Sequence, residues 1–309
     1  MATMTLNETD RKEQDMGQSI SAAVPDTPTA VTDKATLVYE GVQAKRGIIP
    51  GFVVNWVLSA LSLFIGLTIW TLVSVYVLGS RSFLLPTPWQ VLTKSLLAPS
   101  HLKVMLAALA LTTRVALLGL AIAFVIGTLT AIAMKHSTFA EKALYPYAVI
   151  LQTIPVLALV PLLGLWFGYG FASRTTVCVL FCLFPIISNT LFGLKSIDQG
   201  MQDLFASRGA SFWQRLWKLE MPAALPSMFT GLRTSSGLAV VGAVVADMYF
   251  TQGTPGIGTL ITVYTSRLQS MDLFGAIVLS ALLGLIVFQI FSKVSDMVIG
   301  RWHLTRKDE

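Results

Sequence analysis

Long runs without a charged side chain dominate this sequence and restrict the environment in which it can fold. An α-helix rises about 1.5 Å per residue, so about 20 apolar residues cross the roughly 30 Å hydrocarbon core of a membrane. Five runs of at least that length contain no Asp, Glu, Lys or Arg: Gly47–Ser80, Val115–Met134, Ala143–Ser173, Thr175–Leu194 and Leu273–Ser292. A sixth apolar segment, Met228–Phe250, is interrupted only by Arg233 and Asp247 near its ends. We therefore predict an all-α membrane protein with six transmembrane helices.

Composition supports the same class of protein. Only 12% of the residues are charged and 54% are hydrophobic, whereas soluble domains have about 25% charged residues. The first 46 residues differ, being polar and poor in aromatic side chains. We expect residues 1–46 to form a disordered cytosolic tail, with a regulatory or partner-binding helix as the alternative. Residues 47–309 form the predicted membrane domain, and Val53–Leu78 is expected to be an uncleaved span.

The basic residues predict the orientation of the chain. With the N-terminus inside, 16 Lys and Arg residues fall in cytosolic segments. The five in outer loops are Arg81, Lys94, Lys103, Arg174 and Arg267, and Arg114 lies in or near the second span. An excess of Lys and Arg marks cytoplasmic loops, so both termini are predicted to be cytosolic. The net charge of +6 therefore reflects the basic cytosolic loops of a protein in a lipid bilayer, and no nucleic-acid partner is expected.

Proline residues make the third span unusual. Pro155 and Pro161 each remove one backbone donor and leave a carbonyl that lipid cannot satisfy. Such positions either line a pathway or belong to a kinked packing helix, and both interpretations remain open. The nearby Gln152 and Thr153, and Asn189 in the fourth span, are further pathway candidates.

Asp247 is the only acidic residue inside a predicted span. An ionisable side chain in the membrane is a functional candidate by default. Its position near the end of the fifth span leaves two interpretations, a gate or pathway residue and an interfacial residue. Pairing with Arg114 or Arg267 is one way to neutralise its charge.

The longest segment between spans, Lys195–Ser227, combines charges with large apolar side chains. Ser211 and Gln214 have the spacing of a capping box, which starts a helix. In that helix Trp213, Leu216 and Trp217 share one face.

On either side of that helix, glycine and proline set the boundaries. Asp203–Ser207 forms a second short helical piece, and Gly209 permits the bend between the two pieces. Pro222 and Pro226 are expected to end the second helix and restart the chain as span five. The apolar face lies either on the bilayer surface or in a groove of a partner protein.

The run Asp203-Leu204-Phe205-Ala206-Ser207-Arg208-Gly209, followed by Leu219-Glu220-Met221-Pro222, resembles the EAA signature of ABC-importer permeases. Nine residues separate Gly209 from Leu219, as that signature requires, whereas Asp-Leu-Phe replaces its opening Glu-Ala-Ala. Several further segments resemble the nitrate, sulfonate and taurine branch of the family: Ile154–Pro161, Leu165–Gly168, Phe184–Pro185, Asn189–Thr190, Gly231–Asp247 and Gly256–Ile261. The resemblance covers roughly residues 82–303.

The resemblance implies the type I ABC importer permease fold and a multi-pass location in the bacterial inner membrane. A second permease subunit, forming a homodimer, would complete the pathway, and an extracytoplasmic solute-binding protein would deliver the solute. Two cytosolic ABC ATPase subunits would bind ATP-Mg, so this chain itself needs no cofactor. The residues implied to contact the ATPase are Asp203, Ser207, Arg208, Gly209, Trp213, Leu216, Trp217 and Pro222. Nitrate, sulfonates, taurine, bicarbonate and pyrimidine or flavin vitamin precursors are all compatible solutes.

Other classes of protein find less support in the residues. The sequence contains no Gly-Lys pair, which a phosphate-binding P-loop requires, so we expect no ATPase or other catalytic site. Cys178 and Cys182 lie one turn apart, which favours packing over a metal site, and the three histidines are scattered. An ion-coupled carrier or channel, the alternative function, would be expected to hold several buried charges at mid-membrane depth.

Overall fold

The computed structural model describes residues 51–79 and 83–300, and every regular element among them is a helix. The predicted tail, residues 1–46, lies outside the described residues. The chain divides after Ile65 into two units, and each is described by itself. The described part of the first unit is the beginning of α3 (Gly51–Leu72), and the second unit contains all later elements.

Five helices among the described residues are long and apolar enough to cross a membrane: Val57–Val77, Pro99–His136, Phe171–Lys195, Phe212–Tyr249 and Ser270–Ile299. A bent pair of helices supplies a sixth span if the two are counted together. The predicted all-α fold with six apolar segments is therefore confirmed. The orientation of the termini remains a prediction.

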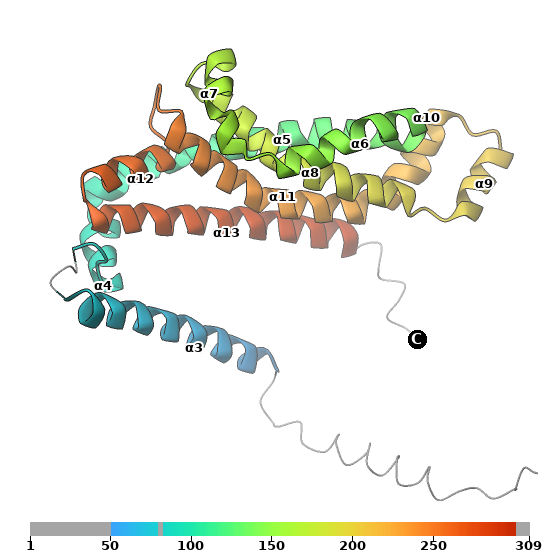
Figure 1. Cartoon of the computed structure of the whole chain (residues 1–309). Coiled ribbons are helices and arrows are strands. Elements are labelled where there is room, and N and C mark those ends of the chain that lie inside the picture. The colour runs from blue at the N-terminus through green and yellow to red at the C-terminus, as the bar shows by residue number, and fades with distance from the viewer. Residues whose placement is uncertain (1–50, 80–82, 301–309) are drawn as a thin grey trace, which may run out of the picture. The chain divides into compact units, whose positions relative to one another are not determined.

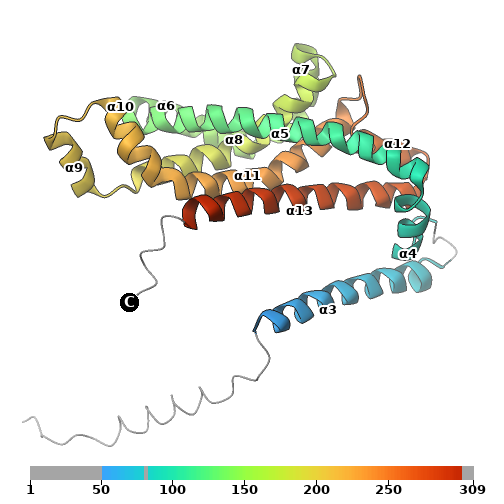
Figure 2. The ribbon, with the colours of Figure 1, turned by 180° about the vertical axis from the view of Figure 1, so that it is seen from behind.

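Four long helices lie side by side in the second unit: α5 (Pro99–His136), α8 (Phe171–Lys195), α11 (Met221–Tyr249) and α13 (Ser270–Gly300) (Figures 1 and 2). Small residues bring three of them together. A Cβ added to Gly119 of α5 would lie 2.5 Å from Cys178 Sγ, and one added to Gly242 of α11 would lie 3.2 Å from Cys178 Cα. Cys178 and Cys182 are fully buried here, which confirms them as packing residues.

Polar contacts hold together the part of the second unit that precedes α5. After α3, a π-helical turn (Val73–Val77) leads to the short helix α4 (Pro88–Val91) and a second π turn (Leu92–Leu96). Trp70 Nε1 donates to the Pro86 carbonyl at 3.1 Å, and Ser74 Oγ donates to the Leu85 carbonyl at 2.5 Å. A capping box at Thr87 starts α4, with Pro88 as the first helical residue.

The third predicted span is broken and not merely kinked. It consists of α6 (Thr138–Thr153) and α7 (Val156–Phe167), which meet at an angle of 105°. Ile154 is extended, with ψ of 130°, because the ring of Pro155 disfavours helical geometry in the preceding residue. Pro161 lies inside α7 without ending it. Figure 1 shows α7 leaving the line of the other long helices of the second unit.

The start of the fifth span corrects a second expectation. Pro222 and Pro226 do not end the preceding helix, because α10 (Phe212–Arg215), a π turn (Leu216–Glu220) and α11 form one helix of 38 residues, Phe212–Tyr249. Pro222 has no N–H, and the wider π turn comes directly before it, with Met221 N–H bonding to the Leu216 carbonyl. A proline in the first turn of an α-helical segment sacrifices no intrahelical bond, so the chain continues through it.

Candidate functional site

One candidate site is the segment between α8 and α11, which extends beyond the end of the long helices (Figure 1). It begins with α9 (Gln199–Ser207), capped by Asp198, whose side chain accepts from Met201 N–H. None of the residues of α9 is buried. Gly209 follows with φ of +64°, a conformation that favours glycine, so the predicted bend is confirmed.

The predicted capping box starts α10. Gln214 N–H donates to Ser211 Oγ at 3.4 Å, and Ser211 N–H donates to Gln214 Oε1 at 3.0 Å. The three predicted face residues line one groove against α5, together with Phe124, Val125, Thr128, Leu129, Ile132, Phe212 and Met221. Leu216 is buried in it, whereas Trp213 and Trp217 remain 64% and 63% exposed. The chain itself therefore leaves two large aromatic side chains uncovered.

A second hollow, of about 300 Å³, lies between α9 and α10. Its lining combines the apolar Leu204 and Phe205 with the basic Arg208 and Lys218. Asp203 and Ser207 are exposed on α9 nearby, and Pro222 lies in the first turn of α11. The residues predicted to contact the ATPase thus lie between α9 and the first turn of α11, and their role remains a prediction.

Sequence reasoning missed a cluster next to this region. Glu220 is only 1% exposed, and its carboxylate lies 3.0 Å from His136 Nε2 and 3.4 Å from Arg215 Nη2. A lone acidic residue within the apolar Leu219–Met221 run was the available signal. The partner His136 lies 84 positions earlier, on α5, and no local pattern links the two.

The second candidate site surrounds Asp247, which is fully buried near the end of α11. Its partner is Arg174, whose Nη1 lies 3.2 Å from Asp247 Oδ1. Arg174, and not Arg114 or Arg267, which the sequence offered as one way to neutralise Asp247, is therefore the observed partner. Arg174 was assigned to an outer loop, but it lies in the first turn of α8 and is only 1% exposed.

Arg174 also holds the segment that follows α11. Its Nε donates to the Phe250 carbonyl at 2.7 Å, and its Nη2 and Nη1 donate to the Gln252 and Thr254 carbonyls, each at 3.1 Å. A guanidinium is suited to this task because it presents five donors in a fixed plane. The loop is thus fixed by the same side chain that neutralises Asp247.

Thr112 of α5 joins the network from the other side. Its Oγ1 donates to Asp247 Oδ2 at 2.5 Å and accepts from Ile257 N–H, at the start of α12 (Ile257–Ser266), at 2.9 Å. Glycine is required beside it, because a Cβ on Gly256 would lie 1.9 Å from Asp247 Oδ2. The resulting buried clasp, Thr112, Arg174 and Asp247, connects α5, α8, α11 and α12.

The remaining pathway candidates are not gathered at one place. Gln152, Thr153, Pro155 and Pro161 are exposed around the α6–α7 break. Asn189 is half-buried on α8, where its Nδ2 donates to the Pro185 carbonyl at 2.8 Å. Their role in a pathway remains a prediction, as does that of Asp247. Within the described ranges, no three His, Cys, Asp or Glu side chains group as metal ligands would.

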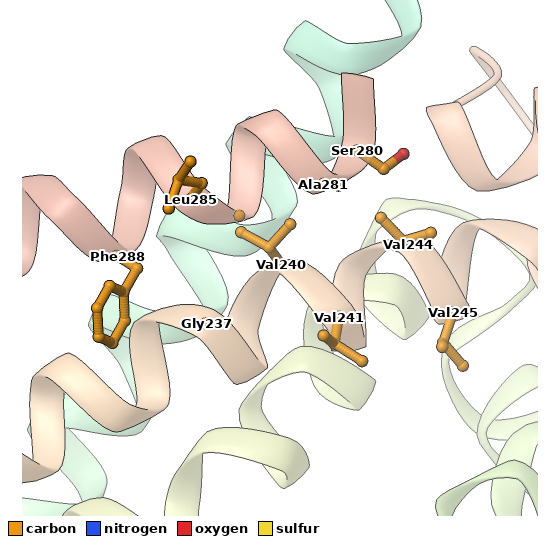
Figure 3. A pocket seen from close by; sticks show the side chains of 10 residues that line it. Gly237, Val240, Val241, Val244, Val245, Ser280, Ala281, Leu285 and Phe288 are labelled. Atoms are coloured by element: carbon orange, nitrogen blue, oxygen red, sulfur yellow. The ribbon is translucent and has the colours of Figure 1, made fainter. Parts of the chain in front are cut away.

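An apolar groove of about 580 Å³ runs between α11 and α13 (Figure 3). Val240 of α11 and Phe288 of α13 point into the space between the two helices. Ser280 is the only residue with a polar side chain in the lining, which otherwise consists of Gly237, Val240, Val241, Val244, Val245, Ala281, Gly284, Leu285 and Phe288. This surface suits apolar contact better than a polar solute.

Comparison with known proteins identifies the fold and the family. A profile described as binding-protein-dependent transport system inner membrane component matches residues 123–301. The formylaminopyrimidine transport permease protein ThiX of Halalkalibacterium halodurans is 34% identical over 75% of this chain and 91% of its own length. The riboflavin transport system permease protein RibX of Chloroflexus aurantiacus is 32% identical over 72% of this chain and 82% of its own length.

Two further matches agree with these. The taurine transport system permease protein TauC of Escherichia coli is 34% identical over 63% of this chain and 71% of its own length. A chain of the inward-facing MetNI methionine ABC transporter superposes with a TM-score of 0.52 and 17% identity over 69% of this chain and 98% of that one, which supports the fold alone. The profile match spans more than half of the sequence, from α5 to α13. The chain therefore belongs to the binding-protein-dependent transport system inner membrane component family, the multi-pass plasma-membrane permeases of ABC importers.

Proposed function

We propose that this permease docks a cytosolic ABC ATPase on the α9–α10 segment and passes the movement of that ATPase to the membrane helices. The observation that carries the proposal is the exposure of this segment: α9 buries none of its side chains, and Trp213 and Trp217 are more than half exposed. The uncovered aromatic side chains of the groove against α5, and the basic Arg208 and Lys218 of the separate hollow between α9 and α10, both suit contact with a protein partner.

Membership of the family supports the remaining partners of this proposal. Two ATPase subunits bind and hydrolyse ATP-Mg, and a second copy of this permease completes the pathway. An extracytoplasmic binding protein delivers a small polar or anionic solute. Relatives named for formylaminopyrimidine, riboflavin and taurine support a vitamin precursor or a sulfonate as that solute. Selectivity then rests largely on the binding protein.

Gly209→Glu tests the docking surface. Gly209 has φ of +64° and open space around the position of a Cβ, and Gly253 has φ of +85° and equally open space. Gly253→Glu is therefore a matched control with similar backbone strain outside the docking segment. We expect recovery of the ATPase in pull-down to fall at least about tenfold for Gly209→Glu, and to be unchanged for Gly253→Glu.

Membrane insertion of both variants is measured in parallel. Equal ATPase recovery for Gly209→Glu and the wild type would remove the docking surface from this segment. Solute uptake by the permease alone, without any ATPase, would instead support the ion-coupled carrier as the function.

A further inference from the structure

Glu220 is a buried carboxylate at the end of the π turn that joins the proposed docking segment to α11. Burial of an ionised carboxylate is unfavourable unless opposite charges lie close by. Arg215 supplies one such charge, since its Nη2 lies 3.4 Å from Glu220 Oε1. Both residues belong to the same helix, five positions apart, and the π turn between them helps to bring them together. Arg215 therefore cannot connect Glu220 to another element.

His136, the last residue of α5, makes that connection. Its Nε2 lies 3.0 Å from Glu220 Oε2, and its ring packs edge-on against Phe212 at 4.6 Å between centroids. The contact has the distance of an ion pair but not the angles of a directional hydrogen bond. Its strength therefore depends on the charge of the imidazole.

The other ring nitrogen indicates which charge state fits. His136 Nδ1 lies 3.0 Å from the Ile132 carbonyl, which only accepts, so Nδ1 carries a proton. A neutral ring would then present the Nε2 lone pair to the Glu220 carboxylate, which is repulsive. A second proton on Nε2 makes the contact attractive. The C-terminal end of α5 favours the same cation.

Charged residues on the neighbouring elements do not replace this pair. Glu141 of α6 and Lys195 of α8 bind each other at 2.5 Å. Lys135 on α5, Lys142 on α6 and Lys218 on the π turn add positive charge to the same end of the bundle. Among the described residues, none of these three lysines forms an ion pair with Glu220, whose charged partners are His136 and Arg215.

We propose that His136 and Glu220 are positioning residues that link α5 to the coupling segment through a proton on the imidazole. The proposal rests on the proposed function, because the movement it transmits is that of the docked ATPase. The charged link moves α5 together with α10 and the π turn. Deprotonation of His136 uncouples α5 while the ATPase stays bound at α9. Transmission is therefore present at low pH, where the imidazole carries both protons and attracts the carboxylate, and it is lost at high pH, where the imidazole is neutral.

A cysteine at Ala133 reports the movement of α5. Ala133 is exposed and lies three residues before His136, whereas Cys178 and Cys182 are buried and out of reach of a polar thiol reagent. The full chain is co-purified with its ATPase in lipid nanodiscs. The labelling rate with ATP-Mg and vanadate is divided by the rate with ADP-Mg, at about pH 6 and about pH 9, on either side of ordinary histidine titration. Taking the ratio cancels the pH dependence of the thiol reaction itself.

We expect the wild-type ratio to differ from one by about fivefold at the lower pH, and to approach one at the higher pH. Glu220→Gln and His136→Gln should give a ratio near one at both pH values with ATPase recovery unchanged. His136→Arg keeps a permanent charge and should restore the ratio at both. A merely structural role for His136 would not produce that loss of pH dependence.

The proposal is overturned if the wild-type ratio is the same at both pH values, or if His136→Arg and His136→Gln behave alike. Should Glu220→Gln fail to fold, this pair of histidine variants still decides. Failure of any ATPase to co-purify with the wild type overturns the proposed function as well. If the ATPase co-purifies normally and the variants keep the wild-type labelling ratio, only the link between His136 and Glu220 is excluded, and the proposed function stands.

Discussion

Arg174 Nη1 and Asp247 Oδ1 lie 3.2 Å apart and join the first turn of α8 to the last turn of α11. Both side chains are almost completely buried. The guanidinium also donates to the Phe250, Gln252 and Thr254 carbonyls. Arg174 thus neutralises Asp247 and also fixes the loop after α11, which gives a structural reason for burying two charged side chains here.

Removing one member of this pair should be strongly destabilising. Asp247→Asn leaves the Arg174 cation buried without its counter-charge, and breaking a buried pair in this way costs about 3–5 kcal/mol. We expect the variant to unfold at clearly lower temperature in detergent. Arg267→Ala, which removes an exposed arginine, is the control and should change stability by less than about 0.5 kcal/mol. Equal thermal stability of the two variants would contradict the importance of the clasp.

The glycine beside the clasp gives a second prediction. Gly256→Ala places a methyl carbon only 1.9 Å from Asp247 Oδ2, which is a severe overlap. We expect a loss of about 1–3 kcal/mol, measured by thermal unfolding. The matched control is Gly237→Ala, since nothing lies within 4 Å of a Cβ there. In the control, alanine should be neutral or slightly stabilising because Gly237 lies inside α11. The reverse order of stabilities would exclude the described packing around Asp247.

The break between α6 and α7 depends on Pro155. Pro155→Ala restores an N–H donor and relieves the restriction on Ile154, so we expect the two helices to straighten. Spin labels at Tyr147 and Leu165, both exposed, measure the change. A continuous helix would separate these positions by about 27 Å, and the bent form is shorter. Pro161→Ala is the control, because Pro161 lies inside α7 without breaking it. An unchanged distance in Pro155→Ala would show that tertiary contacts, not the proline, hold the break.

The orientation of the chain is also open to test. Single cysteines are introduced at two exposed positions, Trp213 and Gln252. Trp213 lies in α10, and Gln252 lies in the loop after α11. The positive-inside pattern predicts that a membrane-impermeant reagent labels position 252 in intact cells and position 213 only in inverted vesicles. Labelling of position 213 from outside would reverse the predicted topology and rule out an ATPase at α9.

Local signals in the sequence were sufficient for part of this picture. Ser211 and Gln214 are three residues apart and form the capping box that their spacing predicts. Gly209 adopts the positive φ that the bend requires. Such features depend on neighbouring backbone atoms, so a sequence pattern contains the necessary information.

The contacts between distant residues could not be derived in this way. Arg174 and Asp247 are 73 positions apart, and the first turn of a span resembles a loop when it contains a charge. The effect of Pro222 was misjudged for a different reason. Proline ends a helix by steric clash and by the loss of a hydrogen-bond donor, but a π turn before it lets the chain continue, and the local sequence pattern does not predict that turn.

The unbroken helix from Phe212 to Tyr249 contains 38 residues. At about 1.5 Å per residue it measures about 57 Å, nearly twice the hydrocarbon thickness of a bilayer. Asp247 anchors it close to one end. If that anchor acts as a fulcrum, a tilt of about ten degrees displaces the opposite end by about 10 Å over this length. The same small tilt of the helix therefore moves Phe212 by about 10 Å while it changes the packing around Asp247 only slightly.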